Sequence, residues 1–528
     1  MLININQIIS LIEKRDFNRA LFLSLQVLEK NPNEYEFIKA TGLIYLLLEN
    51  FSESIKYYHK SLGINQNDLD VLINLSFAYS EMYDVDRSDY YGNIALNRGS
   101  SNPSILFNLA ENQLKRRRFN KAKDLMDKII SFYGGLQECA KDLKNRKILS
   151  KYIDVCLSCG LEKDDIIKIF NKILNENFLS DIFFHWCSYD SGSIDQKYIE
   201  MAKQEINSNY ENSMIKSKNI IHFCFGLANY YKNDQQLSEK YYVVGNEHAS
   251  KILRYNSIVE QKKIQKLKEV FSNQEIIKYQ SSNKMSGEGL IFIIGLPRSG
   301  TTLTESILST ADNIAPAGET LIMPNLSKKY YLPNLDYALN ENALEEIGQE
   351  YTRVINSLAN NKKFIIDKLP NNFFNVGFIT KSLPQAKIIH VSRNKWANGT
   401  SLFQQLYISN IPYSSSFFNI GVHVANYEEI MSFWKKQNYI NEKNFLNIEY
   451  ENLVQNTEEI ASKMFAFCGL SGSYNENKRG GFFARTASKN QVTQKIYRSS
   501  INKEIFMSFR EEFNESYKNQ TEYWMRKH

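Results

Sequence analysis

A pattern of large apolar and small residues repeats every 34 positions over the first part of the chain. Each unit has a large apolar residue, a small residue three positions later, and an aliphatic residue near its end. The matching positions are Phe17, Phe51, Val85 and Phe119; Ala20, Ser54, Ser88 and Ala122; and Leu28, Leu62, Leu96 and Ile130. A small residue at this period is typical of stacked helical hairpins, because it lets two helices cross closely. The pattern predicts an all-α solenoid of four hairpins over residues 1–134.

This period resembles that of the tetratricopeptide repeat. The following residues, 135–280, keep a helical pattern but lose the strict period. Residues 220–246 restore it once, with Ser238 at the small-residue position, so we expect a degenerate repeat there. A further amphipathic helix is predicted over about 249–271, and the polar, Gly- and Ser-containing segment 281–288 is predicted to be a linker.

The pattern changes at Leu290, where five apolar residues predict a short buried strand. Gly295 and Gly300 follow, and two glycines at this spacing let a loop turn its N–H groups inward towards an anion. From Thr301 the spacing is helical. A strand, a glycine loop and a helix N-terminus together form a phosphate-binding architecture. Nucleotide-hydrolysing loops carry Lys at the position of Thr301, whereas the cation in this loop is Arg298.

Three later segments also predict buried strands: residues 364–368, residues 386–392, and a strand that begins at Phe445. Amphipathic helices are predicted over 424–437 and 457–468. Alternation of strands and helices is typical of an α/β domain with a central parallel sheet, over residues 289–528. Functional residues are expected at the carboxyl ends of such strands.

The amino-acid composition and net charge exclude few classes of protein. The 528 residues are 43% hydrophobic, and the net charge of +6 suits an anionic ligand without requiring one. The basic run 115–118 is expected to be a solvated helix end rather than a nucleic-acid site. The sequence shows no apolar run of membrane-spanning length and no basic leader, and its six cysteines are scattered, which predicts a cytoplasmic protein with reduced thiols.

The stretch 297–303 (Pro-Arg-Ser-Gly-Thr-Thr-Leu) resembles the 5′-phosphosulfate loop of sulfotransferases that use 3′-phosphoadenosine 5′-phosphosulfate (PAPS). The resemblance points to the tyrosylprotein sulfotransferases and to bacterial proteins that join tetratricopeptide repeats to such a domain. It implies that the cofactor's 5′-phosphate is bound by Arg298, Ser299, Gly300, Thr301 and Thr302. The family has a Glu 21 positions after the loop Arg, and Glu319 has that spacing here.

The same resemblance assigns roles to the other candidate residues. Glu319 would be the general base, and Lys368 would stabilise charge on the sulfuryl group together with Arg298, with Asp367 orienting Lys368. Arg393 and Ser401, eight positions apart, would hold the 3′-phosphate, although Asn394-Lys395 replaces the family's usual Asp-Pro. Tyr450 would lie near the nucleotide. Ser488 would assist catalysis, and Lys495 would contact a phosphate.

The sequence therefore predicts a PAPS-dependent sulfotransferase that acts on an acceptor hydroxyl and needs no metal. Two alternatives stay open. The first is a P-loop kinase or NTPase, which Thr301 in place of Lys and the absence of a Walker B Asp make less favoured. The second is a repeat scaffold with an inactive catalytic domain. The acceptor is undetermined among protein or peptide (tyrosine included), glycan, lipid and small molecule. The repeats are expected either to recruit a substrate or to form a homodimer.

Overall fold

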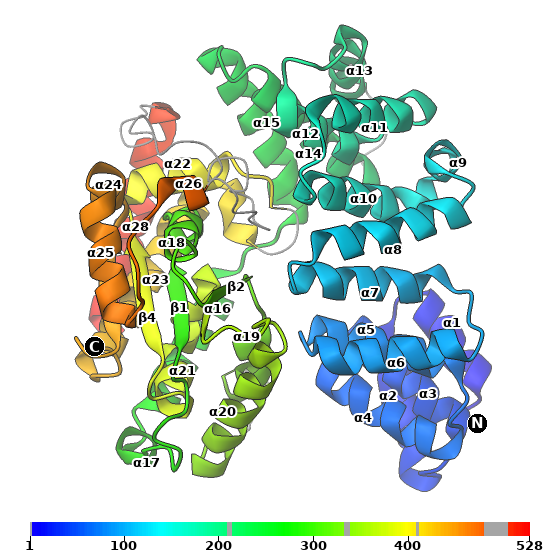
Figure 1. The fold of residues 1–528 in the computed structure, drawn as a ribbon, viewed down its shortest axis with the longest axis horizontal. Coiled ribbons are helices and arrows are strands. Elements are labelled where there is room, and N and C mark those ends of the chain that lie inside the picture. The colour runs from blue at the N-terminus through cyan, green and yellow to red at the C-terminus, as the bar shows by residue number, and fades with distance from the viewer. Residues whose placement is uncertain (1–2, 209–213, 332–337, 408–410, 480–504, 528) are drawn as a thin grey trace. The chain divides into compact units, whose positions relative to one another are not determined.

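The computed structural model describes the chain except for residues 1–2, 209–213, 332–337, 408–410, 480–504 and 528 (Figure 1). The chain divides into two compact units, Met1–Gly135 and Leu136–His528. The first is all-α, and the second contains further helices and one five-stranded sheet. The predicted fold class, a helical repeat region followed by an α/β domain with a parallel sheet, is confirmed.

The N-terminal unit consists of four helical hairpins with the predicted period. The first helices of the hairpins are α1 (Ile5–Glu13), α3 (Tyr35–Leu47), α5 (Leu69–Glu81) and α7 (Pro103–Lys115). The second helices are α2 (Phe17–Lys30), α4 (Phe51–Ile64), α6 (Val85–Asn97) and α8 (Phe119–Phe132). The second helices begin at the four large apolar residues that define the repeat, so the sequence period marks a recurring helix start.

The small residues of the repeat lie where the two helices of a hairpin touch. Ala20, Ser54, Ser88 and Ala122 are all fully buried. Ser54 Oγ donates a hydrogen bond to the carbonyl of Gly42 on the facing helix, at 2.8 Å. A Cβ at Gly42 would lie only 2.8 Å from the buried ring of Tyr58. Close helix crossing in these repeats therefore depends on small side chains from both helices.

The turn within each hairpin has a backbone feature that the sequence did not signal. Arg15, Glu49, Tyr83 and Arg117, spaced 34 residues apart, all have φ between 57° and 64°. Residues other than glycine seldom adopt this left-handed region, but one such residue reverses the chain at the end of a helix. The following residue caps the next helix at Asp16, Asn50 and Asp84, whose side chains accept a backbone N–H three positions on.

The prediction of a solvated basic helix end at 115–118 is wrong for its first two residues. Lys115 and Arg116 are only 8% and 6% exposed. Lys115 Nζ donates to Ser80 Oγ at 2.8 Å, while Arg116 lies 2.5 Å from Asp86 and 2.6 Å from Asp89. Partners from the preceding repeat therefore compensate the burial of these cations.

The second unit begins with a set of helices before the sheet. They are α9 (Leu136–Lys141), α10 (Arg146–Ser158), α11 (Lys163–Glu176), α12 (Ser180–Asp190), α13 (Gln196–Asn207), α14 (Met214–Tyr230), α15 (Gln235–Ile252), α16 (Ser257–Phe271) and α17 (Gln274–Lys278). Helices α14 and α15 form the degenerate hairpin, and Ser238 Oγ donates to the Ala228 carbonyl at 3.0 Å. The single helix expected over 249–271 is instead divided, because Leu253 is extended and Asn256 caps α16.

Five parallel strands form the sheet of the second unit. They are β1 (Leu290–Gly295), β2 (Ile314–Gly318), β3 (Phe364–Lys368), β4 (Lys387–Ser392) and β5 (Phe445–Glu449), in the order β2-β3-β1-β4-β5. The sequence predicted four of them. It missed β2 because Pro316 and Gly318 are typical of turns. Sheets tolerate such residues at an edge, and β2 is an edge strand. The chain adds strands on one side of β1 and then on the other, so loops diverge at its carboxyl end.

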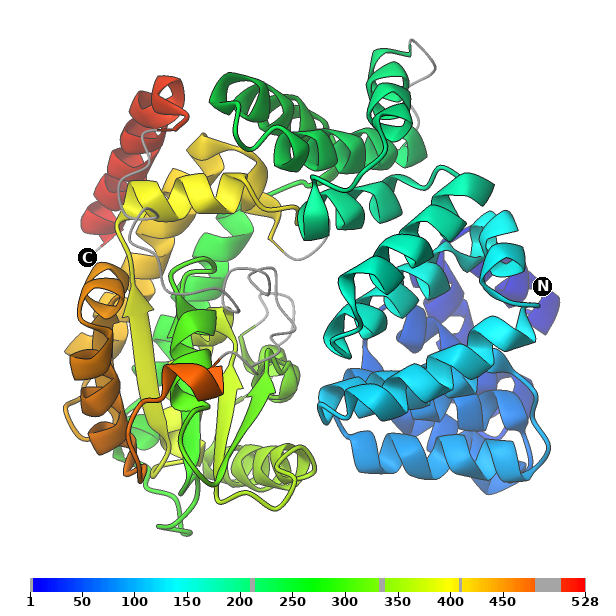
Figure 2. The same ribbon diagram turned by 45° about the horizontal axis from the view of Figure 1, so that its top comes forward.

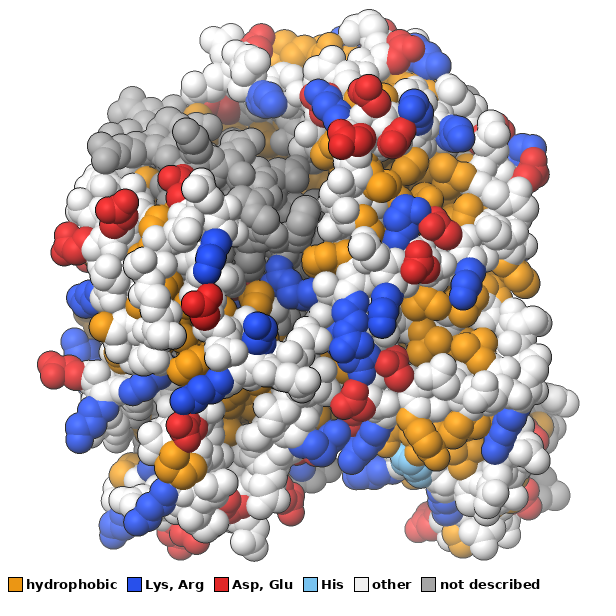
Figure 3. All heavy atoms as spheres, in the orientation of Figure 1, with side chains coloured by type: hydrophobic (Ala, Val, Ile, Leu, Met, Phe, Trp, Pro, Cys, Tyr) orange, Lys and Arg blue, Asp and Glu red, His pale blue; other side chains and the backbone are white. Residues whose placement is uncertain are grey.

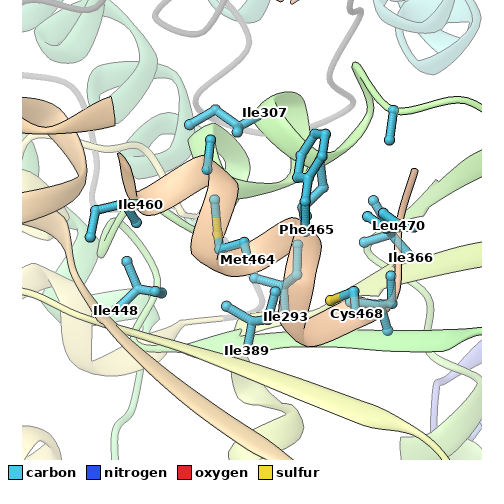
Figure 4. Close-up of a cluster of buried hydrophobic side chains, with 14 of the residues drawn as sticks. Ile293, Ile307, Ile366, Ile389, Ile448, Ile460, Met464, Phe465, Cys468 and Leu470 are labelled. Carbon is cyan, nitrogen blue, oxygen red and sulfur yellow. The ribbon is translucent and has the colours of Figure 1, made fainter. Parts of the chain in front are cut away.

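Helices cover both faces of the sheet (Figure 2). On one face, α18 (Thr301–Leu308) and α25 (Thr457–Cys468) pack on alternate strand residues, in a cluster that contains Ile293, Ile389, Met464 and Phe465 (Figure 4). On the other face, Phe292 meets Tyr351 of α20 (Glu341–Asn356), with ring centroids 5.4 Å apart. Burial on both faces explains why these strands are continuously apolar in sequence.

The remaining elements of this unit connect or flank the strands. They are α19 (Ile322–Ser327), α21 (Val376–Ser382), α22 (Lys395–Phe403), α23 (Phe417–Lys436), α24 (Tyr450–Gln455), α26 (Glu476–Arg479), α28 (Arg510–Lys527), and short 3₁₀ helices that include η3 (Pro370–Asn375) and η4 (Pro412–Ser415). Helix α23 begins seven residues before the predicted start at 424. Ser416 caps it there by accepting the backbone N–H of Asn419.

Two segments that precede the sheet contact the helices that flank it. Phe271 of α16 lies in an aromatic cluster with Phe378, Trp434 and Tyr439. The segment 281–288 is hydrogen-bonded to α20 and α21, through Ser281 to Glu345 and Ser286 to the Ser382 carbonyl, at 3.1 and 3.0 Å. The predicted domain division at residues 281–288 stays a prediction.

The described helices include none that is long and apolar enough to cross a membrane. Hydrophobic side chains reach the surface at several places over the N-terminal unit on the face drawn in Figure 3. Scattered hydrophobic exposure is ordinary for globular proteins, so it assigns no partner.

Candidate functional site

Each of the five strands ends beside a residue that the sequence analysis singled out. The carboxyl end of β1 leads into residues 295–302, the phosphate loop, and β2 is followed by Glu319. Lys368 is the last residue of β3, Arg393 follows β4, and Tyr450 follows β5. Because the strands are parallel, their carboxyl ends share one edge of the sheet, which is where α/β proteins bind ligands.

The phosphate loop adopts backbone angles that few residues other than glycine tolerate. Gly295 and Gly300 have φ of 150° and 106°, and Arg298 itself has φ of 69°. A Cβ at Gly295 would lie 2.4 Å from the Val391 carbonyl oxygen, and one at Gly300 would lie 2.4 Å from the Tyr450 ring. Neighbouring elements thus approach the loop so closely that both positions require glycine.

Four predicted cofactor-binding residues are in contact around this loop. Arg298 Nε donates to Ser401 Oγ at 3.1 Å. Arg393 Nη1 donates to the backbone carbonyl of Arg298 at 2.9 Å, and its guanidinium lies 4.4 Å from the centroid of the Tyr450 ring. The pairing of β4 with β5 explains this last contact, because Ser392 is paired with Glu449 and the next residues are Arg393 and Tyr450.

The phosphate loop holds one buried hydroxyl that suits an anion. Ser299 is 1% exposed, and its Oγ has no hydrogen-bond partner among the described residues. Buried polar atoms normally have a partner, so this hydroxyl is available to a ligand. Thr301 and Thr302 are also buried and begin α18, whose N-terminus attracts negative charge. The residues of the loop therefore fit a phosphate group.

Glu319 and Lys368 form an ion pair at the same edge of the sheet. Lys368 Nζ lies 2.5 Å from Glu319 Oε1 and 3.9 Å from Glu305 Oε2. The side chains of Lys368 and Glu305 are 0% and 1% exposed, whereas that of Glu319 is 40% exposed. The lysine is therefore held between two carboxylates, of which only Glu319 is open to a substrate. Sequence reasoning missed Glu305; a carboxylate in the short helix after the loop was its only signal.

Asp367 does not orient Lys368 by a hydrogen bond. Its Oδ2 accepts from Thr320 Oγ1 at 2.6 Å and from the Tyr351 hydroxyl at 2.7 Å. Burial raises the pKa of Asp367 to about 7, against the smaller opposite effects of these two hydrogen bonds. Since Thr320 follows Glu319, Asp367 ties the end of β2 to β3 and so fixes the distance between Glu319 and Lys368.

Two tyrosines that the sequence did not mark lie within electrostatic range of these groups. The charges of Arg298 and Glu319 both act on the hydroxyl of Tyr407, whose pKa burial raises to about 12. The charge of Arg298 also acts on Tyr242 of α15, whose pKa is raised by burial. Neither residue belongs to a recognisable motif, so no sequence signal could have found them.

Two predicted site residues, Ser488 and Lys495, lie outside the described residues. Within the described part of the chain, no group of three or more His, Cys, Asp or Glu side chains is arranged to hold a metal ion.

Residues 291–475 match the model of the sulfotransferase family. An uncharacterized protein of Aquifex aeolicus is 31% identical over 281 residues, which are 49% of this chain and 36% of that protein. The chain thus spans little more than a third of the curated relative that it matches.

Parts of the chain are similar to parts of solved structures. A tetratricopeptide repeat protein from Parabacteroides merdae is 11% identical, with a TM-score of 0.32, over 42% of this chain and 82% of that one. The sulfotransferase domain of the Synechococcus PCC 7002 olefin synthase is 16% identical, with a TM-score of 0.31, over 46% of this chain and 98% of that one.

The strand order and the helical hairpins define the fold, and the family match of residues 291–475 spans the strands β1 to β5. The C-terminal region of this chain thus contains a sulfotransferase-family domain, preceded by helical hairpins of the tetratricopeptide type.

Proposed function

We propose that the protein is a PAPS-dependent sulfotransferase that transfers a sulfuryl group to an acceptor hydroxyl. The observation that carries this proposal is the grouping, at one edge of the sheet, of the Glu319–Lys368 pair with the phosphate loop and Arg393. These groups supply a proton acceptor, a cation for the transferred group and a phosphate cradle. The match of residues 291–475 to the sulfotransferase family supports the same reaction class.

The donor would be held at both of its phosphate ends. The N–H groups of residues 298–302 and the hydroxyls of Ser299, Thr301 and Thr302 would bind the 5′-phosphate. Arg393 and Ser401 would bind the 3′-phosphate. Arg393 is preorganised for this role, because the Arg298 carbonyl and the Tyr450 ring hold its guanidinium from two sides.

The transfer would proceed by attack of the acceptor oxygen on sulfur. Glu319, the exposed carboxylate of the pair, takes the proton of the acceptor hydroxyl as the new O–S bond forms. The bond between sulfur and the 5′-phosphate oxygen breaks, and 3′-phosphoadenosine 5′-phosphate (PAP) leaves with the electron pair. Lys368 and Arg298 stabilise the charge on the transferred group and on the leaving phosphate, as cations do in phosphoryl transfer.

The acceptor would be a protein or peptide, tyrosine included, recruited by the repeats of residues 1–134. Stacked hairpins present extended surfaces that suit a polypeptide. In this division, residues 135–280 connect the repeats to a catalytic domain over 289–528, with 281–288 between them. Formation of a homodimer through the repeats is the competing role.

Calorimetric titration with PAP, and separately with ADP and magnesium, tests the proposal. Tight binding of PAP alone is expected, because only PAP has a 3′-phosphate for Arg393. A preference for ADP with magnesium would contradict the proposal in favour of a kinase or NTPase. Binding of neither nucleotide would leave a scaffold with an inactive domain.

A further inference from the structure

One buried amide on α22 contacts the phosphate loop, and no motif in the sequence marks it. Asn398 is 0% exposed, and its Nδ2 donates a hydrogen bond to the carbonyl of Pro297 at 3.0 Å. Because a carbonyl can only accept, the nitrogen of the Asn398 amide must face the loop. The two residues are 101 positions apart in the chain, so only the folded protein brings them together.

The other end of the Asn398 amide makes no hydrogen bond within the described part of the chain. Its Oδ1 is buried and has no partner there. A buried amide oxygen without a partner costs stability, and a leucine of the same branched shape would avoid that cost. The hydrogen bond to Pro297 is therefore the polar contact that an asparagine provides at this position.

The loop-facing side of α22 contacts two consecutive residues of the phosphate loop. Asn398 and Ser401 are three positions apart in the helix, so their side chains lie on the same face. Asn398 binds the carbonyl of Pro297, and Ser401 Oγ accepts from Arg298 Nε at 3.1 Å. One helix thus supports both the backbone of the loop and the side chain of its arginine.

Helix α22 is itself fixed at both ends. At its start, the N–H of Asn394 donates to Glu451 Oε1 of α24 at 3.1 Å, and the Asn394 side chain accepts the N–H of Ala397 at 3.0 Å. At its end, the carbonyl of Phe403 accepts from Asn246 Nδ2 of α15 at 2.8 Å. The side chains of α22 therefore reach the phosphate loop from a fixed position.

The backbone of the loop needs such support, because Arg298 has a φ of 69°. Residues other than glycine seldom adopt this left-handed conformation. In the trans peptide that joins Pro297 to Arg298, the carbonyl and the N–H point in opposite directions. Since Asn398 holds the carbonyl on the outside of the loop, the N–H of Arg298 is directed to the inside, where an anion is expected.

We infer that Asn398 is a positioning residue for the phosphate loop, which holds the Pro297 carbonyl and so aims the Arg298 N–H at the 5′-phosphate of the donor. This inference rests on the proposed function, in which the loop binds that phosphate. Asn398 itself does not touch the donor. Its effect is confined to recognition of the 5′-phosphate, whereas Arg393 and Ser401 bind the 3′-phosphate.

Calorimetric titrations with PAP and with adenosine 3′-monophosphate, which lacks the 5′-phosphate, test this role. The variant Asn398→Leu keeps the number and branching of the side-chain heavy atoms and cannot donate a hydrogen bond. We expect its PAP affinity to fall about tenfold, as loss of one hydrogen bond to a charged group predicts, and its affinity for the 3′-monophosphate to change by less than about twofold. A general structural defect would weaken both ligands equally.

A second variant and a control separate this role from a packing effect. Asn398→Ser shortens the side chain and adds no bulk, and the same loss of preference for PAP is expected. Asn145→Leu is the matched control, because Asn145 is a buried asparagine whose Nδ2 donates to the Cys139 carbonyl at 3.2 Å, in the helices that precede the sheet. The control should bind both nucleotides like the wild type.

A preference for PAP that survives in both Asn398 variants would overturn the inference, as would equal weakening of PAP and adenosine 3′-monophosphate. A wild-type protein that fails to bind PAP, or binds it no more tightly than the 3′-monophosphate, would instead overturn the proposed function. The titration of the wild type therefore distinguishes the two failures.

Discussion

The repeat unit and the sulfotransferase-family domain assemble their buried polar contacts over very different distances along the chain. In the repeats, Ser54 bonds Gly42 and Ser88 bonds Ser76, each pair 12 residues apart, and contacts with the preceding repeat, such as Lys115 with Ser80, span 35. In the domain, the site pairs Glu319 with Lys368 across 49 residues and Arg298 with Ser401 across 103. Local periodicity thus determines the repeats, whereas the order of the strands determines the site.

Both regions bury hydroxyl groups, some with and some without a partner, and Ser61 Oγ of the repeats has none among the described residues. In the repeats, Ser24 and Thr41 meet each other at 2.7 Å, which satisfies both hydroxyls inside the protein. In the domain, Ser299 Oγ of the phosphate loop is buried without a partner among the described residues. An unsatisfied buried group costs stability, so its presence at the strand edge indicates a place for a ligand.

The largest expected effect comes from Glu319→Gln. If the site depends on Glu319 as the base, release of PAP from PAPS in the presence of acceptor should fall by about 10²- to 10⁴-fold, with PAP affinity unchanged. Glu522→Gln, at a surface ion pair with Arg526, is the control and should retain full activity. Unchanged turnover in Glu319→Gln would remove the base assignment.

The next largest effect is on the free energy of unfolding, and it tests the buried ion pair between Lys368 and Glu305. Lys368→Met removes the buried ammonium that lies 3.9 Å from the Glu305 carboxylate, which should cost about 3–5 kcal/mol of unfolding free energy. The double variant with Glu305→Gln should recover a large part of that loss, since the buried charge is then gone. Urea unfolding measures the free energy of unfolding of the single and the double variant. A double variant as unstable as Lys368→Met would show that the two residues are not coupled.

A smaller effect on the free energy of unfolding should distinguish two glycines of the repeats, Gly42 and Gly63. Gly42→Ala should cost about 1–3 kcal/mol, because its new methyl would meet the fully buried Tyr58 ring at 2.8 Å. Gly63→Ala has no atom within 4 Å and should stabilise helix α4 by roughly 0.5–1 kcal/mol. Thermal or urea unfolding of the two variants compares them directly. Similar stabilities would mean that close crossing does not depend on the small residue.

The smallest effect concerns the aromatic support of Arg393. Tyr450→Leu removes the ring that lies 4.4 Å from the guanidinium, a contact worth about 0.5–2 kcal/mol. PAP affinity should therefore fall roughly 2- to 30-fold. Tyr450→Phe keeps the ring and should bind PAP like the wild type. If the two variants behave alike in calorimetry, Tyr450 does not position Arg393.

The sequence predicted most of the fold because both regions carry local signals. The 34-residue period marked the start of each second helix, and apolar runs marked β1, β3, β4 and β5. It missed β2, whose Pro316 and Gly318 are typical of turns. It also misread Lys115 and Arg116, because their partners Ser80, Asp86 and Asp89 lie in the preceding repeat.

The candidate site was predictable only where motif spacing existed. Spacing from Arg298 marked Glu319, and the strand ends marked Lys368 and Arg393. The structure adds the buried Glu305, and it adds Tyr407. These residues come from separate elements that only the folded chain brings together, so no spacing along the sequence connects them. Ser488 and Lys495 stay predictions.

The most direct measurement compares Arg393→Ala with the wild-type protein in titrations with PAP and with 5′-AMP, which lacks the 3′-phosphate. We expect the wild type to prefer PAP. We expect Arg393→Ala to lose roughly 10-fold or more in PAP affinity, as loss of a charge-assisted hydrogen bond predicts, with a much smaller change for 5′-AMP. Equal weakening of both nucleotides would contradict a 3′-phosphate site at Arg393, and with it the assignment of PAPS as the donor.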